Sequence, residues 1–322
     1  MDGTPQQQGH GPGPAPGRLT GVVDESVHQR ACPALRESVA WYSGYRQAGL
    51  PPALHRGLPS PYLTLIFTLD DPLTLLRHPD PRQAPGDYST LLGGLHTTPA
   101  LIAHEGSQSG IQVALAPLGA RTLLGLPAGE LAGLDLPADA VLGRLAAEIQ
   151  ERVQAAPTWH RRFRVLDELL LRQAQLAREP ARTPTPEVAR AWRVLLSSGG
   201  TAPAAALAAE VGWSGRHLAA RFQEHIGLTP KAAARVVRFD RARRMLPGRQ
   251  RLADVAATCG YYDQAHLSRE FHALAGCSPS DWLAAENPRD TDDPGSEMSK
   301  PSATPPGETG PIAGGTTRTG SH

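Results

Sequence analysis

Two segments in the last third of this chain repeat one another. Residues 207–230 read LAAEVGWSGRHLAARFQEHIGLTP, and residues 255–279 read VAATCGYYDQAHLSREFHALAGCSP. Four residues of the first segment recur 49 places later: Leu218, Phe222, Gly227 and Pro230 return as Leu267, Phe271, Gly276 and Pro279. Gly212 returns only 48 places later as Gly260, so the second segment carries one extra residue in its turn. The repetition predicts two copies of one small folded unit.

Local chemistry predicts two short helices in each copy. In the first copy, residues 204–210 are strong helix formers, and Gly212 can take the positive φ angle that ends a helix. Ser214 then offers a side-chain oxygen to an unpaired backbone N–H, which starts a second helix over residues 215–225. Asp263 takes the same capping position in the second copy.

The second helix of each copy has an apolar face and an open face. Leu218 and Phe222 lie four residues apart and share one face, so both are predicted core residues, as are Leu267 and Phe271. The open faces carry Gly215, Arg216, Ala219 and Ala220 in the first copy, and Gln264, Ala265, Ser268 and Arg269 in the second. This arrangement is typical of a helix-turn-helix unit.

At these residues the chain resembles the AraC family of bacterial transcription regulators. The matching pattern is Leu-Ala-x-x-Val-Gly-x-Ser-x-x-x-Leu-x-x-x-Phe, then Gly-x-x-Pro and a basic helix over residues 230–246. The second copy, at residues 260–279, looks like the most recognisable segment of that family. The resemblance covers about residues 186–286. It implies an all-α tandem helix-turn-helix domain whose two recognition helices enter successive major-groove segments of DNA, about 34 Å apart.

Charge separates DNA binding from a helical packing module without nucleic acid, because the predicted core residues suit both. The basic residues between positions 231 and 251 are Lys231, Arg235, Arg238, Arg241, Arg243, Arg244, Arg249 and Arg251, against one acid, Asp240. The whole chain, by contrast, has a net charge of only +1. A local basic surplus favours contact with phosphates.

The candidate DNA-binding residues follow from these faces. Arg216, Gln264 and Arg269 are predicted base-edge contacts, because Arg pairs with guanine and Gln with adenine through two hydrogen bonds. Ala219 and Ala220 suit contact with thymine methyl groups or close approach of the helix to DNA. Better-known relatives often carry larger polar residues at these positions, so the two alanines weaken the expected direct readout by the first helix. Lys231 and Arg251 are candidate phosphate contacts, with a solvated charge as the alternative. Ser214, Gly215, Ala265 and Ser268 complete the predicted interface.

Residues 19–182 have a different sequence pattern, with short apolar segments in place of helical repeats, and are predicted as a second domain. The whole protein is therefore predicted to be α+β. Short apolar segments read as strands over 62–69, 89–92, 99–104 and 111–116, with glycine and proline turns between them. They favour a small β-barrel or sandwich. The AraC resemblance implies a cupin-like barrel followed by helices, with a role in ligand sensing, dimerisation or both.

Helical periodicity follows over residues 118–126, 138–155 and 158–176. Two apolar stripes, Leu142, Leu145 and Ile149, and Val165, Leu166, Leu169 and Leu170, suit a dimer contact or packing on the barrel of the same chain. Residues 180–186 are the predicted linker to a DNA-binding domain over 183–286. Residues 1–18 and 287–322 are predicted disordered tails, because they have little to bury.

Several classes of function are disfavoured. The chain has twelve histidines but no His-x-His pair and no zinc spacing, so we expect no metal, no other cofactor and no enzymatic activity. A cupin-like enzyme fused to a DNA-binding module and an architectural DNA-binding protein are the alternatives. Three separated cysteines imply no disulfide framework.

The expected partner is double-stranded DNA. A small-molecule effector, RNA polymerase and a second copy of the chain are further candidates, and no membrane contact is expected. Because residues 1–18 do not read as a signal peptide and no long apolar run follows, we expect a cytoplasmic protein. Activation of transcription is part of this expectation. Effector, target genes, sign of regulation and oligomeric state are not readable from the sequence.

Overall fold

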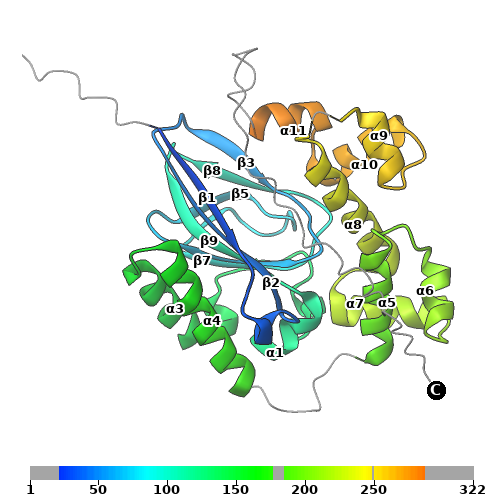
Figure 1. Ribbon diagram of the computed structural model, residues 1–322, viewed down its shortest axis with the longest axis horizontal. Coiled ribbons are helices and arrows are strands. Elements are labelled where there is room, and N and C mark those ends of the chain that lie inside the picture. The colour runs from blue at the N-terminus through cyan, green and yellow to red at the C-terminus, as the bar shows by residue number, and fades with distance from the viewer. Residues whose placement is uncertain (1–21, 177–184, 249, 287–322) are drawn as a thin grey trace, which may run out of the picture.

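The computed structural model describes residues 22–176, 185–248 and 250–286. Both predicted tails, most of the predicted linker and Arg249 lie outside the described residues. Figure 1 shows a sheet-rich part built from the first half of the chain beside a group of helices built from residue 186 onward.

The larger sheet has six antiparallel strands in the order β1-β2-β9-β4-β7-β10. The strands are β1 (Val23–Gln29), β2 (Val39–Ala48), β4 (Leu63–Thr68), β7 (Thr90–Gly93), β9 (Gln108–Leu115) and β10 (Asp135–Leu136). A second sheet has the order β3-β8-β5-β6, with β3 (Ala53–Gly57), β5 (Leu73–Arg77), β6 (Gly86–Tyr88) and β8 (Ala100–His104).

Alternation along β4 explains how the layers stack. Leu63, Leu65 and Phe67 are fully buried in the main core, which also contains residues of the helices α3 (Arg144–Ala155) and α4 (Trp159–Leu176). Ile66 points to the other side, where it joins a small cluster with Leu75 and Ile102 of the second sheet. At β4 the larger sheet is therefore buried on both faces. Because no strand is shared by the two sheets, the described strands form two open sheets and no closed barrel. Of the two forms that the sequence favoured, barrel and sandwich, the sandwich fits, and the α+β class is confirmed.

Helices cover the larger sheet (Figure 1). They are η2 (Pro117–Gly119), α1 (Ala120–Leu124), η3 (Ala128–Leu131), α2 (Asp139–Leu142), α3 (Arg144–Ala155) and α4 (Trp159–Leu176), after an earlier turn η1 (Pro33–Leu35). The single helix predicted over 138–155 is interrupted at Gly143, whose φ of 55° and ψ of −131° no helix allows.

Most residues of the two apolar stripes predicted for a dimer contact are buried within the same chain. Leu142 and Ile149 of the first stripe, and Leu166, Leu169 and Leu170 of the second, are buried in the main core. Phe163 of α4 stacks on Tyr42 of β2, with ring centroids 5.7 Å apart. Packing on the same chain was the alternative to dimerisation, and it is what these residues do.

The remaining helices are α5 (Pro186–Ser197), α6 (Ala204–Glu210), α7 (Gly215–Ile226), α8 (Pro230–Met245), α9 (Leu252–Thr258), α10 (Gln264–Ala275) and α11 (Pro279–Glu286). Helix α8 runs between a lower group, α5 to α7, and an upper group, α9 to α11 (Figure 1). No helix among the described residues is long and apolar enough to cross a membrane.

Candidate nucleic-acid interface

The first copy forms the predicted helix-turn-helix. Gly212 has a φ of 69° in the turn after α6, and the Ser214 hydroxyl accepts a hydrogen bond from the His217 backbone N–H at 3.2 Å. Leu218 and Phe222 are buried, as predicted. The ring of Trp213, in the turn, meets the ring of His217 edge-on at 4.5 Å between centroids. The cap and this ring contact together fix the start of α7.

The second copy repeats this geometry. Gly260 has a φ of 74°, and the Asp263 carboxylate accepts from the His266 backbone N–H at 2.6 Å. The Tyr261 ring meets the His266 ring edge-on at 5.3 Å. The aromatic–histidine contact is a shared feature that the sequence analysis missed. Its signal was a histidine at the third position of both second helices.

The predicted reading faces are open to solvent. Arg216, Gln264 and Arg269 are exposed, and none of their side chains makes a hydrogen bond or ion pair within the described residues. Ser214, Gly215, Ala220 and Ala265 are also exposed, whereas Ala219 and Ser268 are half-buried. The exposed members gather at the amino-terminal halves of α7 and α10, which are the parts of a recognition helix that reach base edges.

Most of the basic residues in α8 serve the fold. Arg235 Nε lies 2.7 Å from Glu270 of α10. Asp240, 5% exposed, accepts from Arg243 at 2.9 Å and pairs with Arg244 at 2.7 Å. Arg238 lies over the Tyr261 ring at 5.7 Å. A buried carboxylate needs such partners, so the basic surplus in this segment overstates the charge available to DNA.

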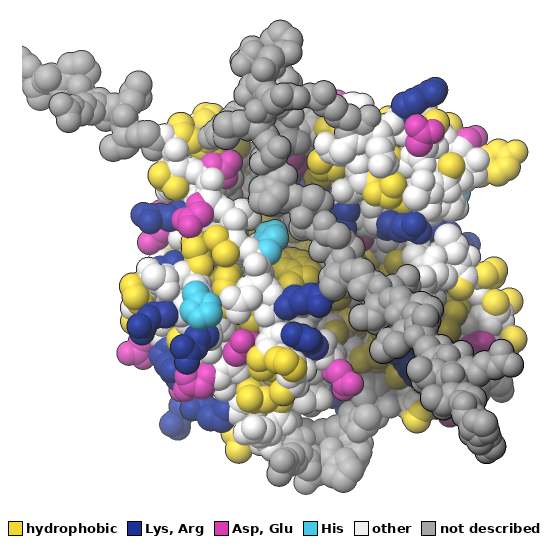
Figure 2. Space-filling model, in the orientation of Figure 1, with side chains coloured by type: hydrophobic (Ala, Val, Ile, Leu, Met, Phe, Trp, Pro, Cys, Tyr) yellow, Lys and Arg dark blue, Asp and Glu magenta, His cyan; other side chains and the backbone are white. Residues whose placement is uncertain are grey.

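Three cations near α8 remain exposed and without an ion pair in the part of the chain that the structure describes. They are Lys231 and Arg251, both predicted phosphate contacts, and Arg241, which the sequence analysis did not single out. Figure 2 shows basic and acidic side chains interspersed over the visible face, without one broad basic patch. The exposed, unpaired cations near α8 are therefore individual side chains among the described residues.

The carboxy-terminal half of α7 lies against the sheet-rich part. A Cβ atom added at Gly129 of η3 would collide with the backbone carbonyls of Gln223 and Glu224, so the two segments touch through their backbones. His225 is buried at this end of α7, and neither ring nitrogen has a hydrogen-bond partner; its Nε2 is 4.0 Å from Glu224. Burial lowers the pKa of His225. A protonated His225 would therefore oppose this contact.

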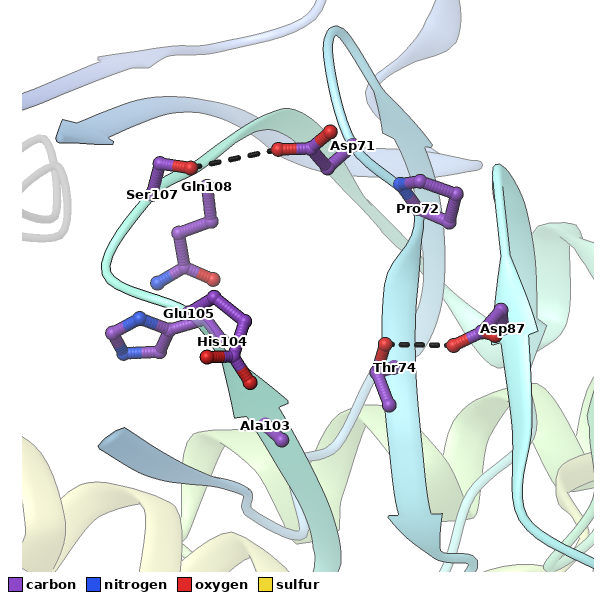
Figure 3. Close-up of a pocket in the computed structure, with 9 residues that line it drawn as sticks. All are labelled: Asp71, Pro72, Thr74, Asp87, Ala103, His104, Glu105, Ser107 and Gln108. Atoms are coloured by element: carbon purple, nitrogen blue, oxygen red, sulfur yellow. Dashed lines mark hydrogen bonds between the residues drawn. The ribbon is translucent and has the colours of Figure 1, made fainter. Parts of the chain in front are cut away.

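A pocket of about 270 Å³ opens at one end of the sheets. Figure 3 shows Asp71, Thr74 and Asp87 on one side of it, facing His104, Glu105, Ser107 and Gln108 on the other. The Asp71 carboxylate accepts from Ser107 at 3.5 Å, and Asp87 accepts from Thr74 at 2.7 Å. Its lining is polar and rich in carboxylates. No cluster of three or more histidine, cysteine, aspartate or glutamate side chains suited to a metal ion occurs among the described residues.

The three cysteines are free thiols. Cys259 is fully buried at the end of α9, as the sequence analysis expected, and burial raises the pKa of its thiol. Cys32 and Cys277 are also free thiols with pKa values raised first by burial. A neutral buried thiol is a small apolar residue.

Two family models match the chain. Residues 207–285 match a helix-turn-helix domain, and residues 28–137 match a domain of unknown function. The first match spans both copies of the repeat and supports the AraC-type resemblance. No curated protein matches the chain.

Among solved structures, the chain is similar to ToxT from Vibrio cholerae. One ToxT structure shows 13% identity and a TM-score of 0.46, covering 75% of this chain and 97% of that chain. ToxT of strain SCE256 with a bound unsaturated fatty acid shows 10% identity and a TM-score of 0.48, covering 80% of this chain and 97% of that chain.

Proposed function

We propose that this chain, a DNA-binding transcription regulator with an AraC-type helix-turn-helix domain, binds DNA sequence-specifically through α7 and α10. Each recognition helix would enter one of two successive major-groove segments on one face of the duplex, about 34 Å apart. Residues 183–286 would form the DNA-binding domain, and residues 19–182 a domain that modulates it.

The observation that carries the proposal is the pair of capped helices with exposed amino-terminal halves. Ser214 and Asp263 cap them, and each helix buries a leucine and a phenylalanine behind the open face. Arg216 and Arg269 each present a free guanidinium, which suits guanine O6 and N7. Gln264 presents a free amide, which suits adenine N6 and N7.

Phosphate contact is assigned to the exposed cations. Lys231 stands in the first turn of α8, directly after the first copy, and Arg251 directly precedes α9 of the second copy. Lys231 lies at the start of the helix that joins the copies and Arg251 lies beyond its end, so the two suit separate positions on the DNA backbone. We add Arg241 to this set because it is exposed and unpaired in the described part of α8.

Modulation by the amino-terminal domain has two structural supports. The acidic pocket of Figure 3 suits a small polar ligand with a positive charge. The contact of η3 with α7 offers a route by which a change in that domain reaches the first recognition helix. A second copy of the chain and RNA polymerase stay proposed partners, without a surface assigned to either.

The test is selection of duplexes from a random-sequence library by the full-length protein, followed by footprinting on the selected site. We expect two protected major-groove segments about 10 base pairs apart on one face. Equal affinity for selected and scrambled duplexes would favour the architectural alternative instead. Turnover of a substrate by the purified protein would favour the enzyme alternative.

A further inference from the structure

Tyr262 is the most exposed large apolar side chain among the described residues. Its exposed fraction is 92%, followed by Leu176 at 76% and Leu54 at 54%. It is also the only aromatic residue of that exposed group within the described chain. A phenol ring that the fold leaves in water suggests a partner that covers it.

The residue sits where the two copies differ. One residue lies between Gly212 and Ser214, the cap of α7, whereas two lie between Gly260 and Asp263, the cap of α10. Tyr261 takes the place of Trp213, because each ring packs edge-on against the histidine of its own helix. Tyr262 is therefore the extra residue of the second turn.

The backbone at this position is held while the side chain is free. The Tyr262 N–H donates to Nδ1 of His266 at 3.3 Å, and Asp263 caps α10 directly afterwards. The phenol hydroxyl makes no hydrogen bond within the described residues. The second turn thus presents the ring at the amino-terminal end of α10, beside the exposed Gln264.

We propose that Tyr262 contacts the sugar-phosphate backbone at the edge of the groove that α10 reads, with its hydroxyl donating to a phosphate oxygen. The inference rests on the proposed function. A residue just before the cap of a recognition helix lies at the groove edge, where tyrosine is a common phosphate donor. Such a contact positions the second helix and adds affinity without sequence preference.

The test compares full-length Tyr262→Ala and Tyr262→Phe with the wild type, on a duplex selected by the wild type and on a scrambled duplex. Leu76→Ala, a truncation of an exposed side chain on β5, is the matched control. Losing one hydrogen bond should weaken Tyr262→Phe binding about fivefold on both duplexes, and Tyr262→Ala at least as much. The control should bind like the wild type.

Salt dependence separates this contact from a charged one. A tyrosine releases no counterion, so Tyr262→Phe should keep the slope of log affinity against log salt. Lys231→Ala should lower that slope by about one. Because the Tyr262 side chain is almost fully exposed, the thermal midpoints of both tyrosine variants should equal that of the wild type.

Three results would overturn the inference. Wild-type affinity in Tyr262→Ala would remove the contact altogether. A loss on the selected duplex alone would make Tyr262 a base reader. Unchanged DNA binding of the tyrosine variants with reduced transcription would indicate that the ring contacts a protein partner instead of DNA. If the wild type itself selects no duplex, the proposed function fails first, and this contact fails with it.

Discussion

Arg235 Nε lies 2.7 Å from Glu270 Oε2, and this pair ties the connecting helix α8 to the second recognition helix α10. Both side chains are more buried than those of a typical surface pair, at 32% and 20% exposure. The pair therefore links the second recognition helix to the helix that joins the two copies.

Glu270→Gln should lower the free energy of unfolding by about 1 kcal/mol, because the charge-assisted hydrogen bond is weakened while the shape is kept. It should also weaken binding to a selected duplex. Urea unfolding and fluorescence anisotropy measure the two effects. Glu210→Gln is the control, since the exposed pair of Glu210 with Arg190 contributes less, about 0–1 kcal/mol. Equal losses in the two variants would contradict a bracing role for Glu270.

Arg269→Ala should cost about 1–3 kcal/mol of binding to the selected duplex and relax preference at one or two positions. The rival role was an internal salt bridge, but Arg269 is exposed and unpaired among the described residues. Its thermal midpoint should therefore stay at the wild-type value. A lower midpoint with intact sequence preference would show that Arg269 supports the fold instead.

Gly129→Ala should separate α7 from η3, because the new methyl group would meet the backbone carbonyl of Glu224. We expect a larger radius of gyration in small-angle scattering and altered DNA affinity. Glu130→Ala changes an exposed neighbour in the same turn and serves as the control. Identical scattering from Gly129→Ala and the wild type would mean that η3 and α7 adjust locally to the methyl group and stay in contact.

His225 should make the stability of the protein sensitive to acid. Its pKa lies below the ordinary value of 6.5 because of burial, with Arg221 and Arg121 acting in the same direction and Glu224 against it. The unfolded chain therefore binds the proton first, so stability is complete above pH 6.5 and is lost as the pH falls below it.

The check is the thermal midpoint of wild type and His225→Gln measured from about pH 7.5 to about pH 5. The wild type should lose more on acidification than the variant, which cannot titrate at this position. Parallel curves for the two proteins would contradict the prediction.

A fragment over residues 183–286 should fold and bind DNA, because it contains both copies, the helix α8 that joins them and the helix α5 that packs on the first copy. Circular dichroism and anisotropy measure folding and binding. Its affinity should be lower than that of the full chain, since the contact of η3 with α7 is lost and any avidity from a second copy goes with it. A fragment without helical signal would contradict the proposed boundary.

Local chemistry made much of the second half of the chain readable from sequence. Two glycines at positive φ, two caps and four buried apolar residues were predicted, and the structure has each of them. These features depend on residues a few positions apart, so short-range rules suffice. The match of residues 207–285 to a helix-turn-helix domain confirms that reading.

The first half was predicted less well, because its sheets depend on residues far apart in the sequence, which short-range rules do not cover. The sequence indicated β4, β7, β8 and β9 but missed the other strands, which are β1, β2, β3, β5, β6 and β10. Strand β1 is largely exposed and lacks the alternation that marks a half-buried strand. The two open sheets, in place of a barrel, follow from pairings between distant residues, such as Leu63 with Leu115.

Sequence by itself determined the repeat, the caps and the apolar faces, because each is written in neighbouring residues. Only the tertiary structure decided which arginines are free for DNA: Arg235, Arg243 and Arg244 are engaged by carboxylates, whereas Arg216 and Arg269 are open. It also decided that the stripes of α3 and α4 are covered by the chain's own core. The partner of a charge or of an apolar face is a residue that folding brings close to it. The distance between two such residues cannot be obtained by counting positions along the sequence.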